Sequence, residues 1–182
     1  MIRGGVYRES LGSITKSLTI QPYPHEQVWV NGADVVTTWS AGTTQTTQGK
    51  FVHQGIPAKF CLDAAAVFNA ANCADAGFVV PRPEAALPDM VYIDGVEQRQ
   101  VTSLAQVVPG TFFADYPGNQ MVLGVDPTGH TVEVAARERA LQWSGTGSLT
   151  LRGIGFTQFA ASLKKFGMVV VDATKGAAGT PV

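Results

Sequence analysis

The chain of 182 residues carries little charge: only 15% of its residues are Asp, Glu, Lys or Arg, and they leave a net charge of −1. Without a basic excess, the sequence offers no electrostatic footprint for nucleic acid. No basic amphipathic stretch indicates a membrane surface as partner, and the apolar runs are too short to span a bilayer. The apolar fraction of 45% argues against disorder, which leaves a globular chain.

Long helical faces rich in Glu and Lys are missing, whereas 20 Gly and 10 Pro are present. Together with strand-like segments rich in Thr and Val, this composition predicts a β-rich, turn-rich chain. The sequence contains no Gly-x-Ser-x-Gly, no Walker-type phosphate loop and no dinucleotide fingerprint, since Gly153-Ile154-Gly155 lacks the third Gly and a following helix. We therefore expect no cofactor.

Cysteine and histidine are scarce. Cys61 and Cys73 are the two cysteines, and they bracket a segment of small residues. A disulfide between them would contribute about 3 kcal/mol in the chain-entropy model and fits an oxidising compartment; the alternative is two unrelated buried thiols. Two Cys without close His partners do not form a four-ligand metal site. The three histidines are too scattered to predict a metal triad, so we expect no metal.

Short apolar or alternating segments, separated by Gly or Pro, occur near both ends of the chain. Their ranges are 5–10, 18–21, 27–36, 149–156 and 168–173. Such strands suit a coil in which each turn buries the apolar face of its neighbour.

Between these segments, residues 37–130 read as a β-rich excursion. Residues 62–71 are the best helical candidate. Residues 111–124 predict a hairpin, with Pro-Gly-Asn as its turn.

Both ends of the chain open in the middle of this pattern. No apolar signal-peptide core follows Met1, so either the protein is cytosolic or the chain begins inside a longer precursor, and we favour the second. After Val171-Asp172 the chain shows no capping helix. An uncapped coil exposes unpaired strand edges, so we expect an open C-terminal edge through which the chain can self-associate.

At this point a family resemblance is evident. The segments Gly5-Val6-Tyr7-Arg8-Glu9 and Leu18-Thr19-Ile20-Gln21-Pro22-Tyr23-Pro24 resemble the opening rungs of secreted bacterial right-handed parallel β-helix proteins of the pectate-lyase-like superfold. Residues 87–95, 109–116 and 123–129 look like the small β domain inserted near the start of those helices, and residues 140–156 resemble the rung where the helix resumes.

The resemblance implies an all-β fold, in which right-handed parallel β-helix rungs are interrupted by a small β-rich insert with one short helix. The first rungs would occupy residues 1–36, the insert residues 37–130, and the continuing rungs residues 131–182.

The resemblance also implies a function. It indicates a secreted, extracellular, carbohydrate-active protein that binds or processes a polysaccharide or oligosaccharide, by glycoside hydrolase or lyase chemistry. In such enzymes the catalytic residues usually lie on central rungs, which would fall outside this chain, so whether the protein is an enzyme stays open. The alternative is a non-catalytic structural or adhesive β-helix module, because fold alone does not give function.

Aromatic side chains supply candidate sugar-stacking platforms, since a flat face with a polar handle suits an amphipathic ligand. The candidates are Trp29, Trp39, Trp143 and Tyr116. Trp39 lies in a polar stretch and is predicted to be the best exposed, and alternation with two valines turns Trp29 outward. The alternative for all of them is packing at the seam between helix and insert.

Charged candidates also have a structural alternative. Arg152 would project outward from a strand, where it could hold a carboxylated sugar bidentately or stack in a ladder of rungs. Asp94 and Asp115 are candidates because glycoside hydrolysis usually needs two carboxylates, but both adjoin turns, where an Asp side chain accepts hydrogen bonds from backbone N–H groups. Glu133, with the arginines that follow it, predicts a solvated surface network.

Overall fold

The computed structural model describes residues 1–57, 87–161 and 167–172. The predicted helix at 62–71, Cys61 and Cys73 lie outside the described residues. Within them the chain is all-β, as predicted: strands alternate with turns, and the helical element is a short 3-10 helix, η3 (Leu104–Gln106).

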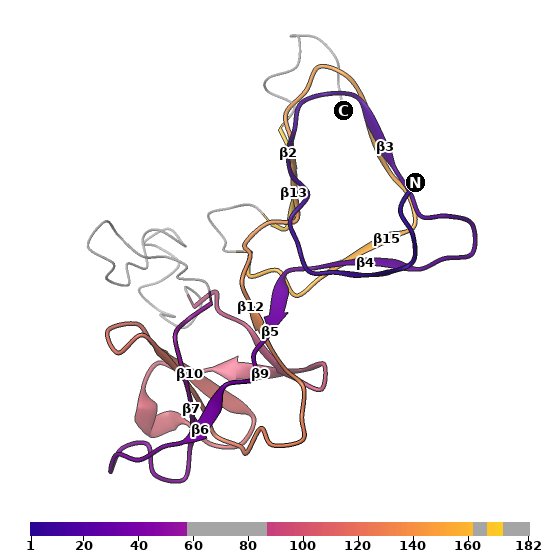
Figure 1. Cartoon of the computed structure of the whole chain (residues 1–182). Helices are drawn as coiled ribbons and strands as arrows, with labels where there is room; N and C mark the ends of the chain where they lie inside the picture. The colour runs from indigo at the N-terminus through magenta and orange to yellow at the C-terminus, as the bar shows by residue number, and fades with distance from the viewer. Residues whose placement is uncertain (58–86, 162–166, 173–182) are drawn as a thin grey trace.

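Three small parallel sheets form a three-sided coil (Figure 1). The first side contains β1 (Gly5–Tyr7), β4 (Val28–Asn31) and β15 (Ile154–Thr157). The second contains β2 (Gly12–Ile14), β13 (Leu141–Trp143) and β16 (Val169–Val171). The third contains β3 (Leu18–Ile20) and β14 (Leu149–Leu151).

The chain visits these three sides repeatedly in the same order. It runs through β1, β2, β3 and β4, leaves the coil, and returns through β13, β14, β15 and β16. Every pairing between strands of the coil is parallel. The stack is two or three strands deep on each side, which is too shallow to define a β-helix by itself.

Alternation explains which side chains fill the coil. Val28 and Val30 in β4 are each 1% exposed, whereas Trp29 between them is 44% exposed, as the sequence predicted. Val30 packs with Ala140 and Phe159 from the returning chain. The core of the coil is therefore formed by segments that lie more than one hundred residues apart in the sequence.

The excursion between β4 and β13 forms one curled, mixed sheet of eight strands, which is the larger part of the described structure. Its strands, in spatial order, are β5 (Ala33–Val35), β12 (Val132–Ala135), β8 (Val91–Ile93), β9 (Val96–Gln100), β10 (Thr111–Asp115), β11 (Gln120–Leu123), β7 (Phe51–Gln54) and β6 (Trp39–Ala41). Neighbouring strands are antiparallel except β9 and β10.

The mixed sheet includes two strands outside the range predicted for the insert. The edge strand β5 and its neighbour β12 pair with each other in this sheet, although residues 33–36 and 131–135 fall in the ranges predicted for the coil. The predicted hairpin is confirmed as β10 and β11.

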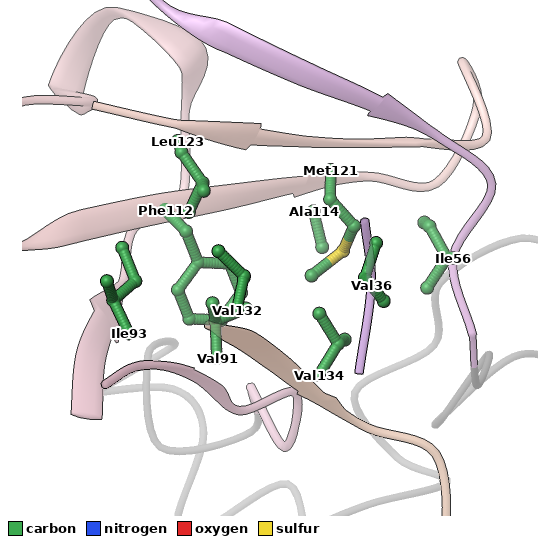
Figure 2. Packing of buried hydrophobic residues seen from close by; sticks show 10 residues of the cluster. All are labelled: Val36, Ile56, Val91, Ile93, Phe112, Ala114, Met121, Leu123, Val132 and Val134. Atoms are coloured by element: carbon green, nitrogen blue, oxygen red, sulfur yellow. The ribbon is translucent and has the colours of Figure 1, made fainter. Parts of the chain in front are cut away.

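The curl of the mixed sheet encloses its core. Strands that are not neighbours in the sheet contribute side chains to one cluster, which Figure 2 shows: Val36, Ile56, Val91, Ile93, Phe112, Ala114, Met121, Leu123, Val132 and Val134. A smaller cluster of Val52, Val101, Val107 and Val122 covers the opposite face. The mixed sheet therefore has apolar packing on both faces.

A polar network joins the coil to the mixed sheet. Glu133 in β12 is 8% exposed and accepts hydrogen bonds from Arg8 (Nη2–Oε1 2.5 Å) and Gln158 (Nε2–Oε2 2.9 Å). Gln158 in turn accepts a hydrogen bond from Asn31 (2.6 Å). The prediction of a solvated network around Glu133 is wrong, because residues distant in sequence cover it; Arg137 pairs instead with Asp34.

Candidate functional site

The mixed sheet carries a groove of about 430 Å³ beside its edge strand β6. Side chains from β6, β7 and the loop before β12 line it, including Trp39, Phe51, Thr37, Thr128, His130 and Thr131. The lining combines aromatic faces with hydroxyl and imidazole groups. Such a mixture suits an amphipathic ligand, because apolar area and a few polar groups together fix its position.

Trp39 is the aromatic wall of this groove. It is half-buried and packs against the core cluster of the mixed sheet, which corrects the prediction of a well-exposed ring. Its indole N–H donates to the carbonyl of Val36 (3.0 Å). Across the strand pair, the ring of His53 lies 5.4 Å from the indole, centroid to centroid, with a tilt of 50°. Both contacts hold the indole in a fixed orientation at the groove wall.

His130 contributes an ordered polar group to the groove. Its Nδ1 lies 2.5 Å from Oδ2 of Asp94, whose Oδ1 accepts a hydrogen bond from the Thr131 amide (2.9 Å). Asp94 and Gly95 form the turn between β8 and β9 with φ of 50° and 79°, a pair that the Asp-Gly dipeptide favours. Three strands, β9, β10 and β11, lie between Asp94 and His130 in the sequence, so no local pattern could have paired the two residues.

The carboxylates near the groove stay ionised. The hydrogen bond from His130 is the largest cause of a lowered pKa at Asp94, and the Thr128 hydroxyl and amide lower the pKa of Asp126. Both groups therefore accept hydrogen bonds at neutral pH and are poor proton donors.

Among the described residues, the carboxyl of Asp89 has a raised pKa. Asp89 is 5% exposed, the hydroxyl of Tyr116 donates to Oδ2, and Oδ1 has no hydrogen-bond partner among the described residues. Burial raises the pKa of Asp89 to about 6, against the lowering effect of hydrogen bonds from Tyr116 and Gln100. Burial and the neighbouring carboxylate also raise the pKa of Tyr116.

Replacement of Asp89 by asparagine is expected to change the pH dependence of stability. The unfolded carboxyl ionises near pH 3.8 and the folded one near 6, so wild-type stability falls as pH rises through this window. In Asp89→Asn this loss is absent. The free energy of unfolding of the variant should therefore rise by roughly 2–3 kcal/mol relative to that of the wild type as the pH increases from 4 to 7. Urea unfolding at both pH values measures the gain; a constant difference between the two proteins would contradict the assignment.

The other predicted site residues do not join the groove. Trp143 is 7% exposed and its indole donates to the carbonyl of Lys16 (3.3 Å), so its ring packs within the coil. Tyr116 packs against the core and contacts Asp89. Arg152 is exposed directly after β14, on the coil. Asp115 accepts hydrogen bonds from the Gly118 amide (3.0 Å) and Gln120 (2.9 Å), which is the turn chemistry weighed for it.

In the described part of the chain, the His, Cys, Asp and Glu residues form no group of three or more that could hold a metal ion. No helix among the described residues is long and apolar enough to cross a membrane.

Comparison with known proteins extends the description of the fold. No known protein family matches the sequence, and no curated protein matches it. Among solved structures, XylC in complex with xylose matches 88% of this chain with a TM-score of 0.58 at 15% identity. The match covers 30% of the XylC chain. The likeness at this identity shows a shared fold, and the present chain spans less than a third of the length of the protein that it matches.

Proposed function

We propose that this chain is part of a longer, secreted, carbohydrate-active protein with a right-handed parallel β-helix, and that it contributes a sugar-binding surface. The repeated passage through three parallel sides supports the β-helix. The likeness to XylC, whose structure holds xylose, supports a sugar as ligand. The division into first rungs (1–36), insert (37–130) and continuing rungs (131–182) belongs to the same proposal, although β5 and β12, just outside the range 37–130, pair within the mixed sheet.

The observation that carries the sugar-binding proposal is the groove beside Trp39. The Trp39 indole is held in place by a hydrogen bond to the carbonyl of Val36 and by the ring of His53. The hydroxyls of Thr37 and Thr128 and the imidazole of His130 line the same space. A pyranose presents an apolar face and a rim of hydroxyls, which match an aromatic wall with polar groups at its edges.

If the longer protein is an enzyme, we propose that residues outside this chain carry its glycoside hydrolase or lyase chemistry. Asp94 and Asp115, the carboxylates weighed for it, are engaged in turns. The same observation favours the alternative, a non-catalytic structural or adhesive module. In that case strand β16, which pairs only with β13 among the described residues, is the edge through which copies would associate.

Removal of the Trp39 ring is expected to weaken sugar binding. With xylohexaose as the probe, Trp39→Ala should bind about ten-fold more weakly than the wild type, because the stacking surface is lost. Isothermal titration calorimetry on the 182-residue chain measures the affinities. Val96→Ala, which shortens an exposed side chain on β9 away from the groove, is the control and should bind as the wild type does. Absence of wild-type binding at millimolar sugar would overturn the proposal.

A further inference from the structure

The outer face of the coil carries a second aromatic surface, on the side formed by β1, β4 and β15. Val6, Trp29 and Gly155 occupy one row across these three strands. Val6 is 59% exposed and Trp29 is 44% exposed, so the row faces solvent. This side of the coil faces the mixed sheet in Figure 1 and is continuous with it through the β4–β5 connection.

Gly155 determines how the Trp29 ring lies. A Cβ at position 155 would overlap Cε3, Cζ3 and Cδ2 of the Trp29 indole. The indole therefore rests on the glycine of the neighbouring strand, and 44% of Trp29 stays exposed to solvent. Any larger residue at position 155 would lift the ring from the sheet. A flat ring seated on a glycine is the geometry that stacking against a sugar requires.

The indole N–H of Trp29 distinguishes it from the other two tryptophans. Trp39 and Trp143 donate their indole N–H groups to backbone carbonyls. Within the described residues the structure gives Trp29 no such acceptor. An exposed ring with an unused donor at its edge can stack on a pyranose and donate to one of its hydroxyls.

The charges that flank this row are neutralised in pairs. On one side Arg3 pairs with Glu26 (2.8 Å), and on the other Arg8 pairs with Glu133 (2.5 Å). The exposed Arg152 lies in the turn between β14 and β15, where Gly153 has a φ of 60°. The row of Val6, Trp29 and Gly155 itself carries no charge and the two ion pairs beside it are satisfied, which favours a neutral sugar over a uronate.

We infer that the outer face of β1, β4 and β15 binds a neutral pyranose unit of an oligosaccharide, which stacks on Trp29 and accepts a hydrogen bond from its indole N–H. This inference rests on the proposed sugar-binding function and adds a site on the coil, separate from the groove beside Trp39.

The three indole N–H resonances of the chain report on the two sites separately. Trp29→Phe and Trp39→Phe assign two of the resonances, and Trp143, which is buried, provides the third as an internal control. During titration of the 182-residue chain with xylohexaose, the Trp29 resonance should shift and the Trp143 resonance should not. A stationary Trp29 resonance would overturn the inference. If the Trp39 resonance still shifts in that experiment, the proposed function stands without the second site.

Variants at Trp29 separate stacking from general packing. Trp29→Leu should weaken binding at this site about ten-fold, whereas Trp29→Phe, which keeps a smaller aromatic face, should recover part of it. Equal loss in both variants would contradict stacking. Hexagalacturonate tests the class of sugar: we expect weaker binding than for xylohexaose, and tighter binding of the uronate would overturn the assignment to a neutral pyranose.

Discussion

Truncation of Phe112 to alanine is expected to lower the free energy of unfolding by about 3–5 kcal/mol. Phe112 is 0% exposed and lies in the middle of the core of the mixed sheet, next to Val91 and Val132 (Figure 2). Its strand β10 joins the antiparallel β11 to the parallel β9, so the ring lies where the two halves of the sheet meet. Loss of the ring removes buried apolar area and leaves a cavity that the surrounding strands can only partly fill.

Phe113 provides a matched control for this experiment. It is the next residue of the same strand, points to the opposite face and is only partly buried against the smaller cluster. Phe113→Ala should therefore lower the free energy of unfolding by about 1–2 kcal/mol, because the Phe113 ring buries less apolar surface than the Phe112 ring. Urea unfolding monitored by circular dichroism measures both variants. Equal losses would mean that the larger cluster is not the main core of this sheet.

Local patterns predicted the local structure well. The Pro-Gly-Asn turn gave the hairpin of β10 and β11, because turn chemistry and register are properties of neighbouring residues. Alternation placed Trp29 outward between two buried valines for the same reason. In contrast, β2 has the sequence Gly-Ser-Ile and lacks a strand signal. It forms because Leu141 and its neighbours in β13 offer a parallel partner from far along the chain.

The candidate site was less predictable than the fold, because its geometry depends on long-range pairing. The sequence selected Trp39 and Asp94 as separate candidates but gave no reason to connect Asp94 with His130. It also could not show that Trp143 would be enclosed in the coil while Trp29 stayed open. Side-chain exposure on a sheet follows from which strands become neighbours, and that choice is made by contacts distant in sequence.

Replacement of Glu133 by alanine is expected to destabilise the protein by about 3–4 kcal/mol. The Glu133 side chain is 11% exposed and that of Arg8 is 32% exposed, so the guanidinium would remain partly buried without its counter-charge. Gln158 would also lose the acceptor of its side-chain amide. Removal of one partner from a buried network costs more than the network contributes, because the remaining polar groups stay desolvated.

Glu26→Ala is the matched control, since Glu26 also accepts hydrogen bonds from an arginine and from a second donor. It pairs with Arg3 and with the Gly4 amide, but the Arg3 side chain is 74% exposed. Water can replace the carboxylate there, so the expected loss is much smaller than that of Glu133→Ala. Glu133→Gln should fall between the two variants, because it keeps an acceptor and removes the charge. If both alanine variants lose the same free energy, the Arg8–Glu133 pair is solvated like the surface pair and does not lock the coil to the mixed sheet.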